Sequence, residues 1–298
     1  MREKINVIWD METGDPDDFL TLILLLGHPA VNLRAVTVTP GTTEQVGLVR
    51  RAVRGWFGRE DVRIGAFNLD HDKQCVSGWH TKAFGPIEPS RDAEPGGQVL
   101  LECCDAATTL ITGAPLKNLG AAMTLAEETG QPLVLGRWVA QGGFAGEGVV
   151  PAEQQLDKFR GMRTCPSYNM NGDPRSALRA IDHPGIMERR FVSKNVCHGV
   201  TYDAALHARV TAVKDTSRSL EIIWRGMSRY LNDRPSGKLF HDPLAACCAI
   251  NMEIGQWAQV RIFRERGEWG SELEEGSKTL IITGYDHDLF IETLLQTT

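Results

Sequence analysis

The chain has 298 residues, of which 42% are hydrophobic and 23% are charged, a balance typical of globular proteins. Its formal net charge of -6 argues against nucleic acid or an anionic membrane as the main partner. No apolar run approaches the roughly 20 residues that cross a bilayer, and residues 1–4 lack the apolar stretch of a signal peptide. The seven cysteines form no CxxC pair. We therefore expect a cytoplasmic protein with reduced thiols.

Apolar runs rich in β-branched residues alternate with helical patterns along the first half of the chain. Strands are predicted at 5–9, 33–39, 62–66, 107–112 and 132–135, and helices at 17–26, 43–57 and 119–129. This alternation predicts the α/β class, with an open, mostly parallel, Rossmann-like sheet flanked by helices. No linker or repeat interrupts the pattern, so one domain is expected over 1–298. Functional residues should gather at the carboxyl ends of the strands, where Asp10, Thr39 and Gly113 lie.

Two segments rich in glycine, proline and charge are predicted to be long surface loops, at 70–97 and 142–166. The first loop holds His71 and His80, and the second carries several basic residues. Loops of this length are usually functional or disordered. Both loops are therefore candidates for contact with a ligand.

The most informative segment is 7–18, which reads Val-Ile-Trp-Asp-Met-Glu-Thr-Gly-Asp-Pro-Asp-Asp. Five carboxylates lie within nine residues of it, directly after an apolar run that predicts a strand. Like charges this close repel and raise one another's pKa, and a bound cation removes that cost. Oxygen ligands alone suit Ca²⁺ or Mg²⁺ rather than zinc. The alternative is a solvated acidic turn that caps the following helix, since Asp favours helix starts.

A second segment, His-Asp-Pro-Leu-Ala at 241–245, pairs an imidazole with a carboxylate. Proline at the first helical position and Asp before it predict a helix start, running to about residue 252. Capping alone would explain Asp242. His241 suits proton exchange near neutral pH, although a lone histidine is more often a residue of the core or surface.

Three further segments follow strands or precede helices in the same manner. Residues 112–118 offer backbone carbonyls after a strand, 141–144 is glycine-rich, and 169–174 offers the side-chain amides of Asn169 and Asn171 for hydroxyl recognition. Each segment alone is a weak signal, because Gly, Pro, Asn and Asp are common in loops and caps.

Taken in chain order, these segments resemble the nucleoside hydrolase family of the inosine–uridine-preferring type. That family opens with Asp-x-Asp-x-Gly-x-Asp-Asp after its first strand and ends with a late His-Asp-Pro-Leu-Ala. Between them it has Gly-Pro-Leu-x-Asn, Met-Gly-Gly and Glu-Phe-Asn-x-x-x-Asp-Pro segments. The counterparts in this chain lie at 10–18, 114–118, 141–143, 167–174 and 241–245. The resemblance spans nearly the whole chain and implies the nucleoside hydrolase fold.

The resemblance implies a Ca²⁺ that also binds the ribose hydroxyls and the attacking water. The implied ligands are Glu12, Asp18, Asp242 and the backbone carbonyl of Gly113 or Thr112, with Asp10 as a further ligand close by. Either Glu12 or Asp10 would act as the general base, because a carboxylate beside the metal can take a proton from water whose pKa the cation lowers.

The resemblance also implies contacts with the substrate. Asp17 would accept a hydrogen bond from a ribose hydroxyl, and Asn169 matches a sugar-binding amide. His241 matches the residue that assists departure of the base, a task that suits a histidine. Cleavage of the N-glycosidic bond builds positive charge on the sugar, which nearby carboxylates stabilise. His80 is expected in the base pocket beside Trp79, unless its own loop holds it.

The chain departs from the family pattern at several positions. Glu12 replaces an Asp, and the opening motif carries one extra residue at 15–16. Thr42 stands at a sugar-binding Asn, and Ser167 at a Glu. Loss of that carboxylate lessens the repulsion of an anionic group near the 5′ end of the ribose.

The sequence therefore predicts a Ca²⁺-dependent N-ribohydrolase that acts on a nucleoside, modified or 5′-phosphorylated, and assembles as a homodimer or homotetramer. The basic residues Lys158, Arg160 and Arg163 would meet a phosphate, or else are merely solvated. One alternative is a non-catalytic relative that binds Ca²⁺ and a ribosyl ligand. A second is a haloacid-dehalogenase-type phosphatase, since Asp10-Met11-Glu12-Thr13 superficially fits its Asp-x-Asp-x-Thr motif.

Overall fold

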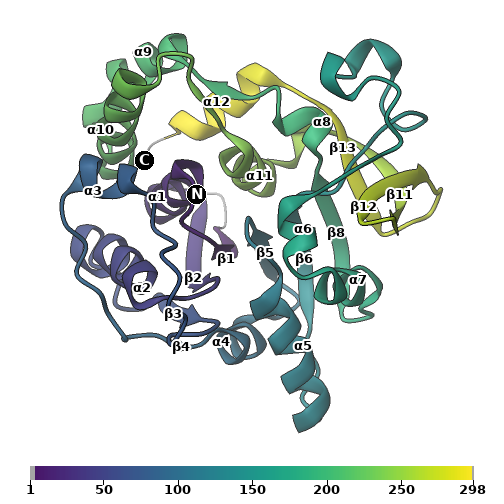
Figure 1. The fold of residues 1–298 in the computed structure, drawn as a ribbon, viewed down its shortest axis with the longest axis horizontal. Coiled ribbons are helices and arrows are strands. Elements are labelled where there is room, and N and C mark those ends of the chain that lie inside the picture. The colour runs from purple at the N-terminus through teal and green to yellow at the C-terminus, as the bar shows by residue number, and fades with distance from the viewer. Residues whose placement is uncertain (1–3, 297–298) are drawn as a thin grey trace.

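The computed structural model describes residues 4–296 and has a large central sheet with helices packed around it (Figure 1). Eleven strands form the sheet in the order β4-β3-β2-β1-β5-β6-β8-β13-β11-β12-β7. All pairs from β4 to β13 are parallel, and the pairs that involve β11, β12 and β7 are antiparallel. This confirms the predicted open, mostly parallel α/β sheet. Residues 1–3, which entered the signal-peptide argument, lie outside the described residues.

The first half of the chain follows the predicted alternation of strands and helices. Its elements are β1 (Ile5–Met11), α1 (Pro16–Gly27), β2 (Val31–Val38), α2 (Thr43–Arg50), β3 (Arg63–Ala66), α3 (Gly78–Phe84), β4 (Glu94–Pro95), α4 (Gly96–Cys103), β5 (Thr108–Thr112), α5 (Lys117–Thr129) and β6 (Leu135–Gln141).

The second half supplies the remaining strands and a group of helices. Its elements are β7 (Thr164–Cys165), α6 (Tyr168–Gly172), α7 (Pro174–Asp182), β8 (Ile186–Val192), α8 (Lys194–Cys197), β9 (Thr201–Tyr202), α9 (Ala204–Val213), α10 (Arg218–Asp233), β10 (Lys238–Leu239), α11 (His241–Ile250), β11 (Gly255–Glu265), β12 (Glu268–Leu273), β13 (Thr279–Tyr285) and α12 (His287–Leu295). Strands β9 and β10 pair as a separate small sheet.

Strand β1 lies where the chain changes direction across the sheet. The chain goes from β1 to β2 on one side and returns to β5 on the other. In open α/β sheets, the carboxyl end of such a strand opens into a crevice between the flanking loops. The acidic residues that follow β1 therefore lie at the position where this architecture places ligands.

Helix α1 is buried along almost its whole length between the sheet and two later helices. Its residues from Pro16 to Leu26 are all buried, and it packs against α10 and α11. Proline at its first turn is preorganised for a helix start, and the run of leucines supplies apolar surface on every side. This packing brings the acidic first turn of α1 beside residues more than 200 positions later in the chain.

Several predicted element boundaries were wrong. The strand predicted at 132–135 begins only at Leu135 and continues to Gln141. The predicted loop at 70–97 contains α3, β4 and the first two residues of α4. The helix predicted at 43–57 is α-helical to Arg50 and then continues as a π-helix over Arg51–Trp56. Residues 142–166 form the expected long loop, with two short 3-10 turns and β7.

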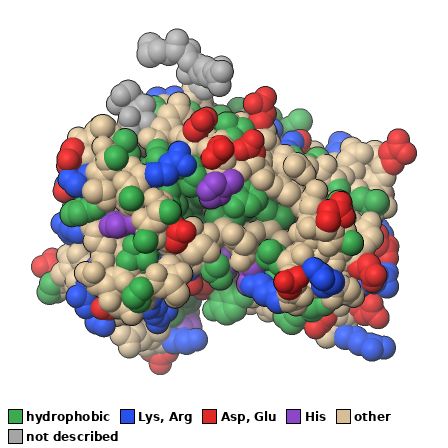
Figure 2. All heavy atoms as spheres, turned by 90° about the horizontal axis from the view of Figure 1, so that it is seen from above, with side chains coloured by type: hydrophobic (Ala, Val, Ile, Leu, Met, Phe, Trp, Pro, Cys, Tyr) green, Lys and Arg blue, Asp and Glu red, His purple; other side chains and the backbone are tan. Residues whose placement is uncertain are grey.

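The seven cysteines are free, as predicted. None of the helices within residues 4–296 has the length and apolar character that crossing a bilayer demands. On the face seen in Figure 2, basic and acidic side chains are interspersed, and no broad basic surface is visible.

Candidate active site

Three buried aspartates meet at the carboxyl end of β1. Asp17 and Asp18 come from the first turn of α1, and Asp242 comes from the first turn of α11. One carboxylate oxygen of each lies within 4.8 Å of the others, and their exposed fractions are 2%, 2% and 5%. The two acidic segments singled out in the sequence therefore form one cluster.

A buried lysine, Lys238, neutralises part of this cluster. Its Nζ lies 2.9 Å from Asp17 Oδ1 and 3.0 Å from Asp15 Oδ2. Burial disfavours the charged lysine, but attraction to Asp17 and Asp15 outweighs it and raises the lysine pKa above its usual value. The other oxygen of Asp17 accepts hydrogen bonds from the backbone N–H groups of His241 and Asp242, at 3.2 and 3.4 Å. Both Asp17 oxygens are thus engaged within the protein.

Asp10 and Glu12 have different surroundings at the end of β1. Asp10 is fully buried, and its Oδ1 accepts hydrogen bonds from Thr37 at 2.6 Å and Asn118 at 2.8 Å. Glu12 lines the cavity above the cluster. Burial raises the pKa of each to about 7, and for Glu12 the charges of Asp15 and Asp17 add to the effect. Glu12 is therefore the one of the two that faces the cavity and can exchange a proton near neutral pH.

The donor set fits a hard divalent cation. Asp242 Oδ1 is buried and has no hydrogen-bond partner among the described residues. Burial raises the pKa values of Asp18 and Asp242 well above the usual range, and the charges of neighbouring carboxylates raise them further. A cation among these oxygens would relieve both the missing partner and the repulsion. The cluster of Asp17, Asp18 and Asp242 thus could hold a metal, with Asp18 and Asp242 as the two aspartates that Lys238 does not engage.

Gly113, at the end of β5, lies directly against this cluster. A Cβ added there would lie 2.6 Å from Asp242 Oδ1 and 2.4 Å from the Trp9 ring. Real Cβ atoms do not approach other atoms so closely. A residue without a side chain is required here for Asp242 to reach the end of β5.

The cluster forms the floor of a cavity of about 290 Å³. Amides and hydroxyls form one wall: Asn169 donates to the backbone and side-chain oxygens of Gln141 at 3.1 and 2.8 Å, and Ser167 accepts from Gly143. The lining residues are Glu12, Asp15, Asp17, Asp18, Gly113, Gln141, Ser167, Tyr168, Asn169, Lys194, His198, His241 and Asp242. Five carboxylates thus line this cavity together with the amides of Gln141 and Asn169 and the hydroxyl of Ser167.

His241 stacks on a second histidine that the sequence did not point to. The ring centroids of His241 and His198 are 4.6 Å apart, and His198 Nδ1 lies 2.8 Å from the ammonium of Lys158. Burial lowers the pKa of His241 to about 4, assisted by Lys238, and that of His198 to about 3, assisted by His241. His241 Nε2 is buried without a hydrogen-bond partner among the described residues. Both imidazoles are therefore neutral at neutral pH, and His241 can only donate or accept a hydrogen bond there.

The structure brings most of the expected site residues together, but not all. His80 is fully buried, with its ring edge-on to Phe19 at 5.5 Å and Trp79 at 4.9 Å, so it does not line the cavity. The sequence predicted a loop at 70–97, but residues 78–84 form helix α3, which packs against the core and buries His80. Thr42 and Asn171 are not among the residues that line this cavity. Thr42 instead caps α2 through a reciprocal capping box with Gln45. Asn171 is tied to Gly267 and Trp269.

Reasoning from the sequence missed His198, Lys194 and Lys238. The first two follow β8, a strand that was not predicted. Lys238 lies three residues before His241, and this closeness was the one available signal for it. Of the basic residues expected to meet a phosphate, Arg160 pairs with Asp157 and Arg163 with Glu272, both at the surface.

Comparison with known proteins agrees with the fold and with the order of these segments. The family model of the inosine-uridine preferring nucleoside hydrolases matches residues 7–292. The chain therefore belongs to this family, as the sequence motifs indicated. This assignment leaves no support for the phosphatase alternative. Among curated protein sequences, none matches the chain.

Solved structures with the same fold share little sequence with the chain. The purine-preferring ribonucleoside hydrolase from Gardnerella vaginalis is 18% identical, with a TM-score of 0.70 over 97% of this chain and 96% of that one. The inosine-uridine preferring nucleoside hydrolase from Bacillus anthracis is 18% identical, with a TM-score of 0.68 over 97% of each chain. A plant nucleoside hydrolase is 14% identical, with a TM-score of 0.69 over 98% of this chain and 99% of that one. The chain is thus a divergent member of its family.

Proposed function

We propose that the protein is a Ca²⁺-dependent N-ribohydrolase that cleaves the N-glycosidic bond of a ribonucleoside to ribose and free base. The observation that carries this proposal is the buried cluster of Asp17, Asp18 and Asp242 beneath a cavity that His241 and Glu12 both line. Membership of a nucleoside hydrolase family supports the same reaction class. The oxygen-only donor set favours calcium over a softer metal.

The site residues have distinct roles in this proposal. Asp18, Asp242, Glu12 and the backbone carbonyl of Gly113 would hold the cation, with Asp10 buried behind them. When bound, the cation supplies Lewis acidity for water and for the sugar hydroxyls. Glu12 takes the proton from the attacking water, because its carboxylate faces the cavity beside the aspartate cluster.

The sugar and the leaving base are handled by opposite sides of the cavity. The amides of Asn169 and Gln141 and the hydroxyl of Ser167 can bind sugar hydroxyls, while the carboxylate floor stabilises positive charge on the ribose. His241 is neutral, so it assists the leaving base by donating a hydrogen bond. His198, stacked on it and held by Lys158, fixes the orientation of its ring.

Release of free base tests the function directly. A panel of purine and pyrimidine ribonucleosides and their monophosphates is incubated with the protein, with and without a chelator, and free base is measured by chromatography. We expect base release from at least one ribosyl compound and loss of release with the chelator, restored by Ca²⁺. Absence of base release from every compound would refute the enzyme.

Two substitutions separate the metal site from the leaving-group site. Asp242→Ala should lose both Ca²⁺ binding and activity, because it removes a buried ligand. His241→Ala should lower kcat by about 10²- to 10⁴-fold, the range for a group that handles a proton, and keep Ca²⁺ binding. Calorimetric titration of Ca²⁺ and base release measure the two effects. Asp286→Ala, which removes the cap of α12, serves as a control with unchanged activity.

The engagement of both Asp17 oxygens favours a second candidate, a relative that binds Ca²⁺ and a ribosyl ligand without turnover. A ribose hydroxyl must compete with Lys238 or with the backbone for this carboxylate. Thermal stabilisation by ribosyl compounds, combined with no base release, would establish the binding protein instead.

A further inference from the structure

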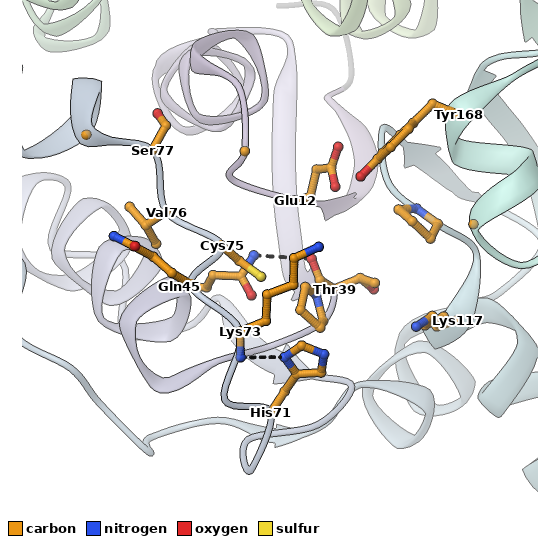
Figure 3. A pocket seen from close by; sticks show the side chains of 16 residues that line it. Glu12, Thr39, Gln45, His71, Lys73, Cys75, Val76, Ser77, Lys117 and Tyr168 are labelled. Carbon is orange, nitrogen blue, oxygen red and sulfur yellow. Dashed lines mark hydrogen bonds between the residues drawn. The ribbon is translucent and has the colours of Figure 1, made fainter.

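A second cavity, of about 580 Å³, opens beside the first one at Glu12 and Tyr168. We propose that this cavity, which we call the lysine chamber, binds an anionic group carried by the substrate, a phosphate or a carboxylate. The proposal rests on the proposed function, because it assigns the substrate class of the same site. The chamber lies between the loop before α3, the end of β2 and the start of α5 (Figure 3).

Two lysines line the chamber from different elements. Lys73 comes from the loop between β3 and α3, and Lys117 is the first residue of α5. Neither ammonium lies within 4.0 Å of a carboxylate in residues 4–296, unlike the ammonium groups of Lys82, Lys214 and Lys238. The Lys117 ammonium lies instead 5.5 Å from the centroid of the Phe67 ring. His71 and the phenol of Tyr168 add polar groups to the same lining.

The two cavities differ sharply in charge. Five carboxylates line the smaller cavity, where positive charge would develop on the sugar. Glu12 is the one carboxylate among the residues that line the lysine chamber, and it lies at the boundary between the cavities. A substrate with its sugar over the aspartates and an anion on the far side of Glu12 would therefore find the complementary charge for each part.

The two cavities adjoin at a shared boundary. Glu12 and Tyr168 line both cavities, and Figure 3 shows their side chains close together above Lys73 and Lys117. Of the basic residues that the sequence suggested for a phosphate, Arg160 and Arg163 pair with acidic residues at the surface, and Lys158 contacts His198 of the smaller cavity rather than the lysine chamber. The geometry thus assigns the anion to Lys73 and Lys117 instead.

The test measures selectivity rather than activity alone. The ratio of kcat/KM for an anionic substrate to that for its uncharged counterpart is determined for the wild type and for the double variant Lys73→Ala/Lys117→Ala. Two pairs distinguish the source of the anion: a nucleoside 5′-monophosphate against the nucleoside, and orotidine against uridine. We expect a wild-type ratio above one for one pair and a fall of about tenfold or more in the double variant, the size expected from losing charge-assisted hydrogen bonds.

Two further variants sharpen the result. Lys73→Arg/Lys117→Arg keeps the charge and should retain most of the preference. Arg160→Ala removes one positive charge from a surface pair outside both cavities and should leave the ratio unchanged. A wild-type preference for the uncharged member of both pairs, or a preference that survives in the alanine double variant, would overturn the inference.

A binding measurement keeps this inference separate from catalysis. Ribose 5-phosphate and ribose are compared by thermal shift in the wild type and in the alanine double variant. A larger shift from the phosphate, lost in the double variant, supports the lysine chamber even where no base is released. Equal shifts from the two sugars, together with no selectivity for orotidine, refute the chamber, whereas absence of base release from all compounds refutes only the hydrolase.

Discussion

Lys238 is a buried lysine that pairs with two carboxylates of the site. Its side chain is 5% exposed, and its ammonium lies between Asp15 and Asp17, beside carboxylates suited to a divalent cation. Removing one partner of a buried ion pair is costly, because it leaves an uncompensated charge in a poorly solvated place. Lys238 therefore stabilises the protein without a metal and at the same time reduces the negative charge that attracts one.

Replacing this lysine should separate the two effects. Lys238→Met keeps the length of the side chain and removes the charge, so we expect Ca²⁺ to bind about tenfold more tightly, since charge count tunes such sites. Without metal, the variant should lose about 3 kcal/mol of unfolding free energy. Calorimetric titration and urea unfolding in chelator measure these changes. Lys214→Met, which breaks an exposed pair with Asp215, is the control, and unchanged or weaker Ca²⁺ binding in Lys238→Met would contradict the argument.

His80 is a second buried residue, and its burial makes the stability of the protein depend on pH. It is fully buried, and burial lowers its pKa from 6.5 to about 4. Between these values the unfolded chain binds a proton that the folded protein does not, so the free energy of unfolding falls as the pH falls below 6.5. The effect of this residue should reach about 2 kcal/mol at pH 5.

The test compares the free energy of unfolding at pH 7 with that at pH 5. His80→Gln should lose less stability than the wild type between pH 7 and pH 5, by about 2 kcal/mol, in urea unfolding. The comparison cancels the constant cost of the substitution. His287→Gln, at an exposed histidine, should keep the wild-type pH dependence. An identical pH dependence in His80→Gln and the wild type would show that the buried imidazole has no such role.

Among the elements, the contact between α4 and α5 supports the site from behind. Asn118 of α5 donates hydrogen bonds to Asp10, to the carbonyl of Val38 and to Thr39, so it links the ends of β1 and β2. A Cβ added to Gly96, the first residue of α4, would lie 2.1 Å from Asn118 Oδ1. The absence of a side chain at Gly96 therefore allows Asn118 to reach Asp10.

Gly96→Ala should displace Asn118 and destabilise the protein by about 1–3 kcal/mol, the usual cost of overpacking. Gly55→Ala provides the matched control, because the nearest atom to its added Cβ is the flexible Arg51 side chain at 4.0 Å. Its effect should have the opposite sign, since alanine favours helix over glycine by about 1 kcal/mol. Urea unfolding of both variants checks the signs, and equal effects would contradict the steric argument.

At the scale of the whole molecule, the candidate metal site joins the two ends of the chain. Asp18 follows the first strand of the large sheet, and Asp242 comes after most of the strands of that sheet along the chain. A cation held by both binds only the folded chain. Its binding free energy should therefore add to the stability of the entire fold.

Calcium should accordingly raise the thermal midpoint of the wild type. At a free concentration of 100 times Kd, the expected gain is about 2.7 kcal/mol. Asp242→Asn should abolish the gain, because it removes a charged ligand with little change in shape. Calorimetric unfolding with Ca²⁺ and with chelator measures it. Equal midpoints in the two conditions for the wild type would show that no cation binds this cluster under the conditions used.

Much of the fold could be predicted from the first half of the chain. Hydrophobic runs and helix caps located β1, α1, β2, α2, β3, β5 and α5, because these signals are local. The second half was harder: the strands β8, β11, β12 and β13 and the helices α9 and α10 were not predicted. Strand order in this part depends on which distant segments pair, and a local pattern does not encode that.

The sequence by itself determined which residues have the chemistry for the site: carboxylates after the first strand, and a histidine and an aspartate at a late helix start. Only the tertiary structure decided which of them meet. The packing of α1 against α11 brings Asp17 within hydrogen-bond distance of a residue 224 positions later. Lys238, just before α11, is thereby placed beside Asp17, and packing of α3 against α1 and α10 buries His80. The physical reason is that burial and pairing depend on the long-range arrangement of elements, whereas residue type alone determines charge and ligand character.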